Sequence, residues 1–136
     1  MIAAPLSSDT TMTFSFLARL TAFVCAALTL ALLFAPGLLL TIFSVDATAE
    51  AAFVARRTAM LFAGYAVLAF MLSATSDPKV QRAFSMAIAL SMTGLAMLGL
   101  AEFMRGFAGP GIFVAIVTEA FFAVAYGLRL TRRTPG

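Results

Sequence analysis

Four long apolar segments, separated by short stretches that hold most of the charged residues, constrain this chain more than any other feature. The segments cover about residues 14–34, 52–74, 80–104 and 110–130. A helix needs about 20 mostly apolar residues to cross the roughly 30 Å hydrocarbon core of a bilayer. Only 11% of the residues are charged, against about 25% in soluble domains. The sequence therefore predicts an all-α integral membrane protein that forms a four-helix bundle.

The first apolar segment continues past residue 34 into APGLLLTIFSVD. Together they make about 30 residues, or about 45 Å at 1.5 Å per residue, which is too long for one crossing. Pro36 and Gly37 are expected to break the helix, and proline suits the first turn of a new one. We therefore expect a short interfacial helix at about 36–43, between spans 1 and 2. Asp46 is the expected N-cap of the second spanning helix, with Glu50 in its first turn.

The two ends of the chain are expected to be tails. Residues 1–13 show no periodicity and are predicted to be disordered, with Met12 as an alternative start residue. No basic segment precedes the first apolar run, so we expect a retained span and not a cleaved signal peptide. Residues 131–136 form a basic C-terminal tail.

Basic residues are distributed unevenly between the two ends of the spans. One end has six and the other has three, namely Arg19, Lys79, Arg82, Arg129, Arg132 and Arg133 against Arg56, Arg57 and Arg105. Basic residues favour the cytoplasmic side of a membrane. We therefore predict a multi-pass protein of the bacterial inner membrane with both termini in the cytoplasm. The net charge of +3 then reflects orientation and does not indicate a nucleic-acid partner.

The composition argues against most enzymatic chemistry. Histidine is absent, and Cys25 is the single cysteine. An intrachain disulfide is thus excluded, and the commonest metal ligand and the usual partner of a nucleophilic serine or cysteine are missing. We expect no cofactor, no metal site and no enzymatic activity.

The fourth span, GPGIFVAIVTEAFFAVAYG, contains one charged residue, Glu119. It is the middle member of a row with four-residue spacing, formed by Gly111, Ala115, Glu119, Ala123 and Gly127. Such rows of small residues let helices approach closely in lipid, so we predict that Glu119 faces other helices. An ionised carboxylate at the bilayer centre costs about 2.5–3.5 kcal/mol on insertion scales. Glu119 is therefore expected to be either paired with a cation or protonated.

No basic residue lies three or four positions from Glu119, so its partner must come from another helix. Arg57 or Arg56 is favoured over Arg19, which lies close enough to the cytoplasm to extend into it. Cys25, Tyr65 and either Ser91 or Thr93 fall at a depth similar to that of Glu119. The candidate intramembrane polar site therefore consists of Glu119, Arg57, Arg56, Tyr65 and Ser91.

A separate pair is expected near the outer surface. Arg105 follows Glu102 at the i+3 position, where opposite charges on a helix attract each other. Glu102 and Arg105 are predicted to form this outer-surface ion pair.

With these motifs in view, the chain resembles a loose group of small four-span bacterial inner-membrane proteins of unknown function. The resemblance covers about residues 14–130. It lies in APGLLLTIFSVD, in ARRTAMLFAG and in LGLAEFMRGFAGPGI, which leads to a span with a central glutamate. It supports the four-span architecture and implies no activity.

Two function classes stay open. The first is a non-enzymatic accessory protein, either a subunit of a larger membrane complex or a homo-oligomer, because the chain is small, has short loops and lacks a catalytic constellation. The second is a small transporter or binder of an apolar or cationic molecule, with Glu119 as an intramembrane proton or ligand site. An enzyme ranks third. Membrane lipids are expected partners in every case.

Overall fold

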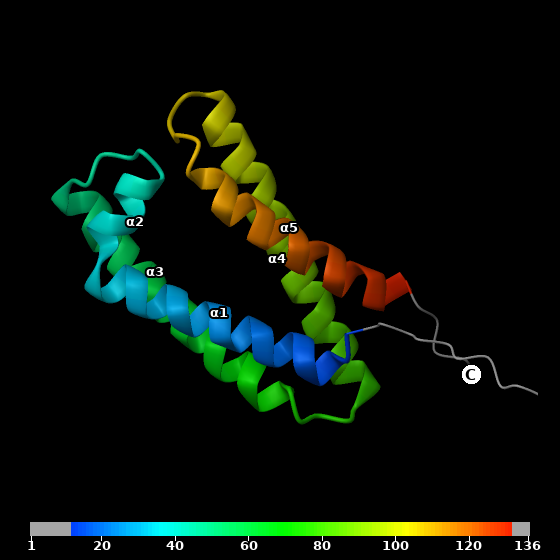
Figure 1. Cartoon of the computed structure of the whole chain (residues 1–136). Coiled ribbons are helices and arrows are strands. Elements are labelled where there is room, and N and C mark those ends of the chain that lie inside the picture. The colour runs from blue at the N-terminus through cyan, green and yellow to red at the C-terminus, as the bar shows by residue number, and fades with distance from the viewer. Residues whose placement is uncertain (1–11, 132–136) are drawn as a thin grey trace, which may run out of the picture.

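The computed structural model describes residues 12–131, and this part of the chain is entirely helical outside its turns. Most of the two predicted tails lies outside it. The helices are α1 (Phe14–Phe34), α2 (Pro36–Ile42), α3 (Ala49–Leu72), α4 (Pro78–Met104) and α5 (Ile112–Thr131), as Figure 1 shows. Four of them, α1, α3, α4 and α5, are long and apolar enough to cross a membrane. The predicted class, an all-α membrane protein with four spans, is confirmed.

The helices begin where the sequence provides a cap. The Thr13 side chain accepts a hydrogen bond from the Phe16 amide at 3.3 Å, and Asp77 accepts one from Lys79 at 2.8 Å. The prediction that Asp46 caps α3 is wrong. Thr48 does so, with its hydroxyl oxygen 3.2 Å from the Ala51 amide nitrogen. Asp46 is still within the preceding turn, where its carbonyl accepts a hydrogen bond from the Thr48 amide at 2.9 Å.

The break between α1 and α2 lies at the proline. The Ala35 amide donates to the Ala31 carbonyl at 2.9 Å and closes α1. Pro36 has no amide hydrogen, so it begins the next helix without losing a hydrogen bond. The short helix α2 of seven residues follows, before the turn that leads to α3.

The four spans form two antiparallel pairs, α1 with α3 and α4 with α5 (Figure 1). In the first pair the Thr29 hydroxyl lies 3.3 Å from the carbonyl oxygen of Ala59, whose small side chain is fully buried. In the second pair Gly99 lies against Ile116, and a Cβ at Gly99 would lie 3.1 Å from Ile116 Cγ1. Small residues thus let the helices of each pair approach closely, as they do in other membrane proteins.

Contacts between the two pairs are concentrated towards both ends. We call the end where α1 begins and α5 finishes the terminal end. Edge-to-face ring contacts, with centroids about 6 Å apart, join Phe14, Phe84 and Tyr126 there. At the opposite end, called the α2 end, the Gly109 amide donates to the Phe43 carbonyl at 2.7 Å. The hydrophobic core of buried side chains occupies the terminal half. Between this core and the α2 end, the pairs leave room for a cavity.

Candidate functional site

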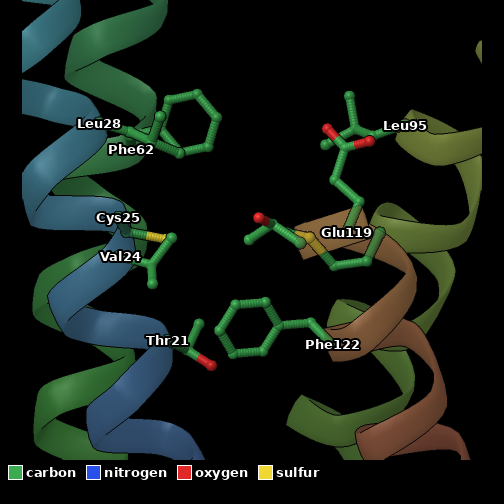
Figure 2. Close-up of a pocket in the computed structure, with 10 residues that line it drawn as sticks. Thr21, Val24, Cys25, Leu28, Phe62, Leu95, Glu119 and Phe122 are labelled. Carbon is green, nitrogen blue, oxygen red and sulfur yellow. The ribbon is translucent and has the colours of Figure 1, made fainter. Parts of the chain in front are cut away.

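A cavity of about 50 Å³ lies between the two helix pairs, and all four spans contribute to its wall. Figure 2 shows Thr21, Cys25 and Leu28 on α1, Phe62 on α3, and Glu119 and Phe122 on α5 across the space from them. Leu95 completes the wall from α4. The glutamate singled out in the sequence thus borders a cavity.

Glu119 reaches this cavity because of its place on α5. Glu119, Phe122 and Tyr126 follow one another at i, i+3 and i+7, the spacing of one helix face. Phe122 and Tyr126 are buried in the core of the terminal half. Glu119 lies farther along the same face, towards the α2 end, and lines the cavity. The face that packs the core therefore directs the carboxylate into the space beyond it.

Within residues 12–131, the Glu119 carboxylate has neither a hydrogen-bond partner nor an ion-pair partner. The structure does not bring it to Arg57, Arg56 or Arg19, all of which are exposed. The Arg57 guanidinium lies over the Phe53 ring instead, 5.7 Å from its centroid.

Helix geometry explains why the two favoured arginines turn away. Phe62 marks the side of α3 that faces the cavity. Arg57 precedes it by five residues and Arg56 by six, which at about 100° per residue turns them roughly 140° and 120° away from that side. The azimuth around α3 therefore prevents the pairing that the sequence favoured.

Tyr65 and Ser91 lie beside the cavity and not in its wall. They line an adjoining hollow of about 260 Å³ between α3 and α4. The hollow and the cavity share four lining residues, namely Cys25, Phe62, Met92 and Leu95. The layer of polar residues expected at one depth is therefore distributed over two adjoining spaces.

Glu102 and Arg105 are held together, away from the cavity, at the end of α4. Arg105 Nη1 donates to Glu102 Oε1 at 3.1 Å. The Arg105 side chain is 65% exposed and the Glu102 side chain 33%. The guanidinium also lies 5.1 Å from the centroid of the Phe107 ring. A pair exposed to this degree contributes about 0–1 kcal/mol to stability.

Sequence reasoning missed the hydroxyl pair that lies beside the cavity. The Thr21 and Tyr126 oxygens are 2.7 Å apart, and Tyr126 is fully buried. The signal was present, because Tyr126 shares a helix face with Glu119. It was missed because the four-residue row of small residues was followed instead. Gly127, the last member of that row, has open space where a Cβ would be.

The remaining hydroxyls of the cavity wall are already engaged. The Thr21 hydroxyl donates to the Leu17 carbonyl at 2.9 Å, and Thr118 donates to Val114 at 2.8 Å. Glu119 therefore contributes the strongest unengaged polar group in the wall, beside the rings of Phe62 and Phe122. Aromatic faces and a carboxylate in an apolar cavity are complementary to an organic cation.

No family model, curated protein or solved structure matches this chain. The class that the fold defines is a small polytopic membrane protein with four candidate spans.

Proposed function

We propose that this polytopic membrane protein binds an organic cation within the bilayer, with Glu119 as the anionic contact. One observation carries the proposal. Glu119 lies in the wall of a cavity that all four spans build, and it has no cationic partner among residues 12–131. Of the two function classes that the sequence left open, this geometry supports the binder or transporter.

The energetics favour a cationic ligand. An unpaired carboxylate at membrane depth is costly, so a counter-charge beside Glu119 is favourable. An organic cation supplies the missing counter-charge. The Phe62 and Phe122 rings add cation–π attraction, about 0.5–2 kcal/mol per well-placed ring. The affinity of the site is therefore expected to depend on charge more than on apolar contact, since lipid already solvates apolar groups.

The proposed setting is the bacterial inner membrane, with both termini in the cytoplasm. The six basic residues predicted at the terminal end support this orientation. The proposed role is to bind or transport a molecule and not to catalyse a reaction.

The test is ligand binding by the full chain in lipid nanodiscs. Octyltrimethylammonium is the probe, and octyl sulfate, with the same chain and the opposite charge, is the matched control ligand. Glu119→Gln removes the charge with little change of shape. We expect it to weaken binding of the cationic probe at least tenfold, about 1.4 kcal/mol, whereas Glu102→Gln leaves binding unchanged.

Equal affinity of Glu119→Gln and the unmodified protein for octyltrimethylammonium would overturn the proposal. The predicted accessory role, as a subunit of a larger complex or a homo-oligomer, would then take its place. Crosslinking in native membranes, followed by identification of the captured chain, distinguishes a second copy from a different protein.

A further inference from the structure

The hollow between α3 and α4 gives the Glu119 cavity a side opening. It reaches from Leu61, which is exposed on α3, to Cys25 and Ile88, which are buried. It adjoins the cavity along four shared lining residues. The opening faces sideways, in the direction that lipid occupies around a membrane-spanning protein.

Both ends of the space between the helix pairs are blocked. At the terminal end the Thr21–Tyr126 hydrogen bond and the buried rings of Phe14 and Phe84 join the pairs. At the α2 end the turn at Gly109 is bonded to Phe43, and Gly111 contacts the carbonyl of Ile42. A ligand therefore has its approach from the side, through lipid, and not along the helix axes.

The size of the cavity limits what lies beside Glu119. One water molecule needs about 10–15 Å³ of such space, so about 50 Å³ accommodates a head group of a few heavy atoms and no alkyl chain. The hollow, at about 260 Å³, is larger than the 150 Å³ cavity that binds benzene in another protein. Its wall is apolar apart from a few hydroxyls and the Cys25 thiol. An alkyl chain attached to the head group must therefore extend out of the cavity into a larger apolar space such as this hollow.

The opposite side is a poorer exit. A second depression, of about 310 Å³ between α1 and α5, also shares lining residues with the cavity, but it is lined by residues of those two helices alone, with Val117 and Phe121 exposed. The α3–α4 hollow has walls from three helices and extends to the buried Cys25. An alkyl chain of the ligand is better enclosed on the α3–α4 side.

We infer that the ligand is a single-chain amphiphilic cation taken laterally from the bilayer, with its head group at Glu119 and its chain in the α3–α4 hollow. This inference rests on the proposed function and adds the ligand's shape and its route of entry. The alkyl chain of the ligand gains little affinity from the hollow, because lipid is equally apolar. The hollow instead selects ligands by the shape of their alkyl chain.

The chain contains no tryptophan, so a single introduced tryptophan reports on its own surroundings. Leu61→Trp places it at the α3–α4 hollow, and Phe121→Trp places it at the depression on the other side. Both positions hold large exposed apolar residues, so both variants are expected to fold. The probe is octyltrimethylammonium with bromine at the chain end, which quenches tryptophan on contact.

We expect quenching at Leu61→Trp to saturate with probe concentration, and Glu119→Gln to remove the saturable part. At Phe121→Trp, quenching should rise only in proportion to the probe dissolved in lipid. Saturable quenching at Phe121→Trp alone, or at neither position, would overturn the inference. If binding of unbrominated octyltrimethylammonium still depended on Glu119 in that case, the proposed function would stand and only the route would be wrong. Loss of the Glu119 dependence itself would refute the proposed function.

Discussion

At the scale of single residues, the two tyrosines of the chain differ in role. Tyr126 is fully buried and bonded to Thr21, whereas Tyr65 is 42% exposed and has no hydrogen-bond partner in the part of the chain that the structure describes. Thr21 has one hydroxyl hydrogen, which it donates to Leu17. Tyr126 must therefore be the donor in the Thr21–Tyr126 bond. This bond is one of the few polar links between the helix pairs.

Tyr126→Phe is expected to lower the free energy of unfolding by about 0.6 kcal/mol, the average value for a hydrogen bond between membrane helices. Thermal unfolding in one detergent measures the effect. Tyr65→Phe removes the same hydroxyl from a position without a bond, so its midpoint should match that of the unmodified protein. Equal midpoints for all three proteins would mean that the Thr21–Tyr126 bond does not hold the pairs together.

Glu119 shows what the sequence can and cannot predict about a residue. Glu119 does face the other helices, in the wall of the cavity, but the row of small residues does not define that face, because Gly127 has open space where a Cβ would be. The partner of Glu119 could not be predicted, because the sequence does not show which side of α3 faces Glu119, and Arg57 lies on the side turned away from the cavity. Whether that face meets a packed side chain or a cavity depends on how far the two pairs diverge. Contacts distant in sequence, such as Tyr126 with Thr21, set that divergence.

At the scale of elements, α2 and the α4–α5 turn form the link at the α2 end. A Cβ at Gly111 would overlap the Ile42 carbonyl, and one at Gly109 would overlap the Ser44 side chain. Glycine is therefore required at both positions by the close approach of the two segments. Gly127, by contrast, lies within α5 with nothing within 4 Å of its Cβ position.

Gly111→Ala is expected to push α2 away from the turn and to lower the unfolding temperature. Gly127→Ala is the matched control on the neighbouring helix. It should leave stability unchanged or raise it, since alanine is favoured over glycine inside a helix by about 1 kcal/mol. The comparison is made by thermal unfolding. Destabilisation by Gly127→Ala and not by Gly111→Ala would contradict the link between α2 and the turn.

The elements themselves were largely predictable because each carries a local signal. Pro36 marks the start of α2, and Asp77 followed by Pro78 marks the start of α4. The start of α3 was placed at the wrong cap because Asp46 and Thr48 are both suitable caps. The choice between them depends on how the turn after α2 ends, and Ser44 in that turn has a positive φ of 57°. A conformation of this kind is rare for a serine and has no sequence signal here.

At the scale of the whole molecule, the uneven basic residues make orientation testable. In a Cys25→Ala background, a single cysteine replaces Ser76 in the α3–α4 turn or Phe107 in the α4–α5 turn, both exposed. An impermeant maleimide should label Phe107→Cys in intact cells and Ser76→Cys only after lysis. The reverse pattern would place the termini outside and contradict the positive-inside assignment.

The two helix pairs are joined towards both ends and separated between them, and we propose that a ligand reaches Glu119 in the cavity there from within the membrane. A hydrophobic carbodiimide, which adds to neutral carboxyl groups in apolar surroundings, tests this claim most directly when mass spectrometry locates the adduct. In nanodiscs we expect modification at Glu119, and protection of that residue by octyltrimethylammonium but not by octyl sulfate. Absence of modification at Glu119, or modification that the cation does not reduce, would contradict the account.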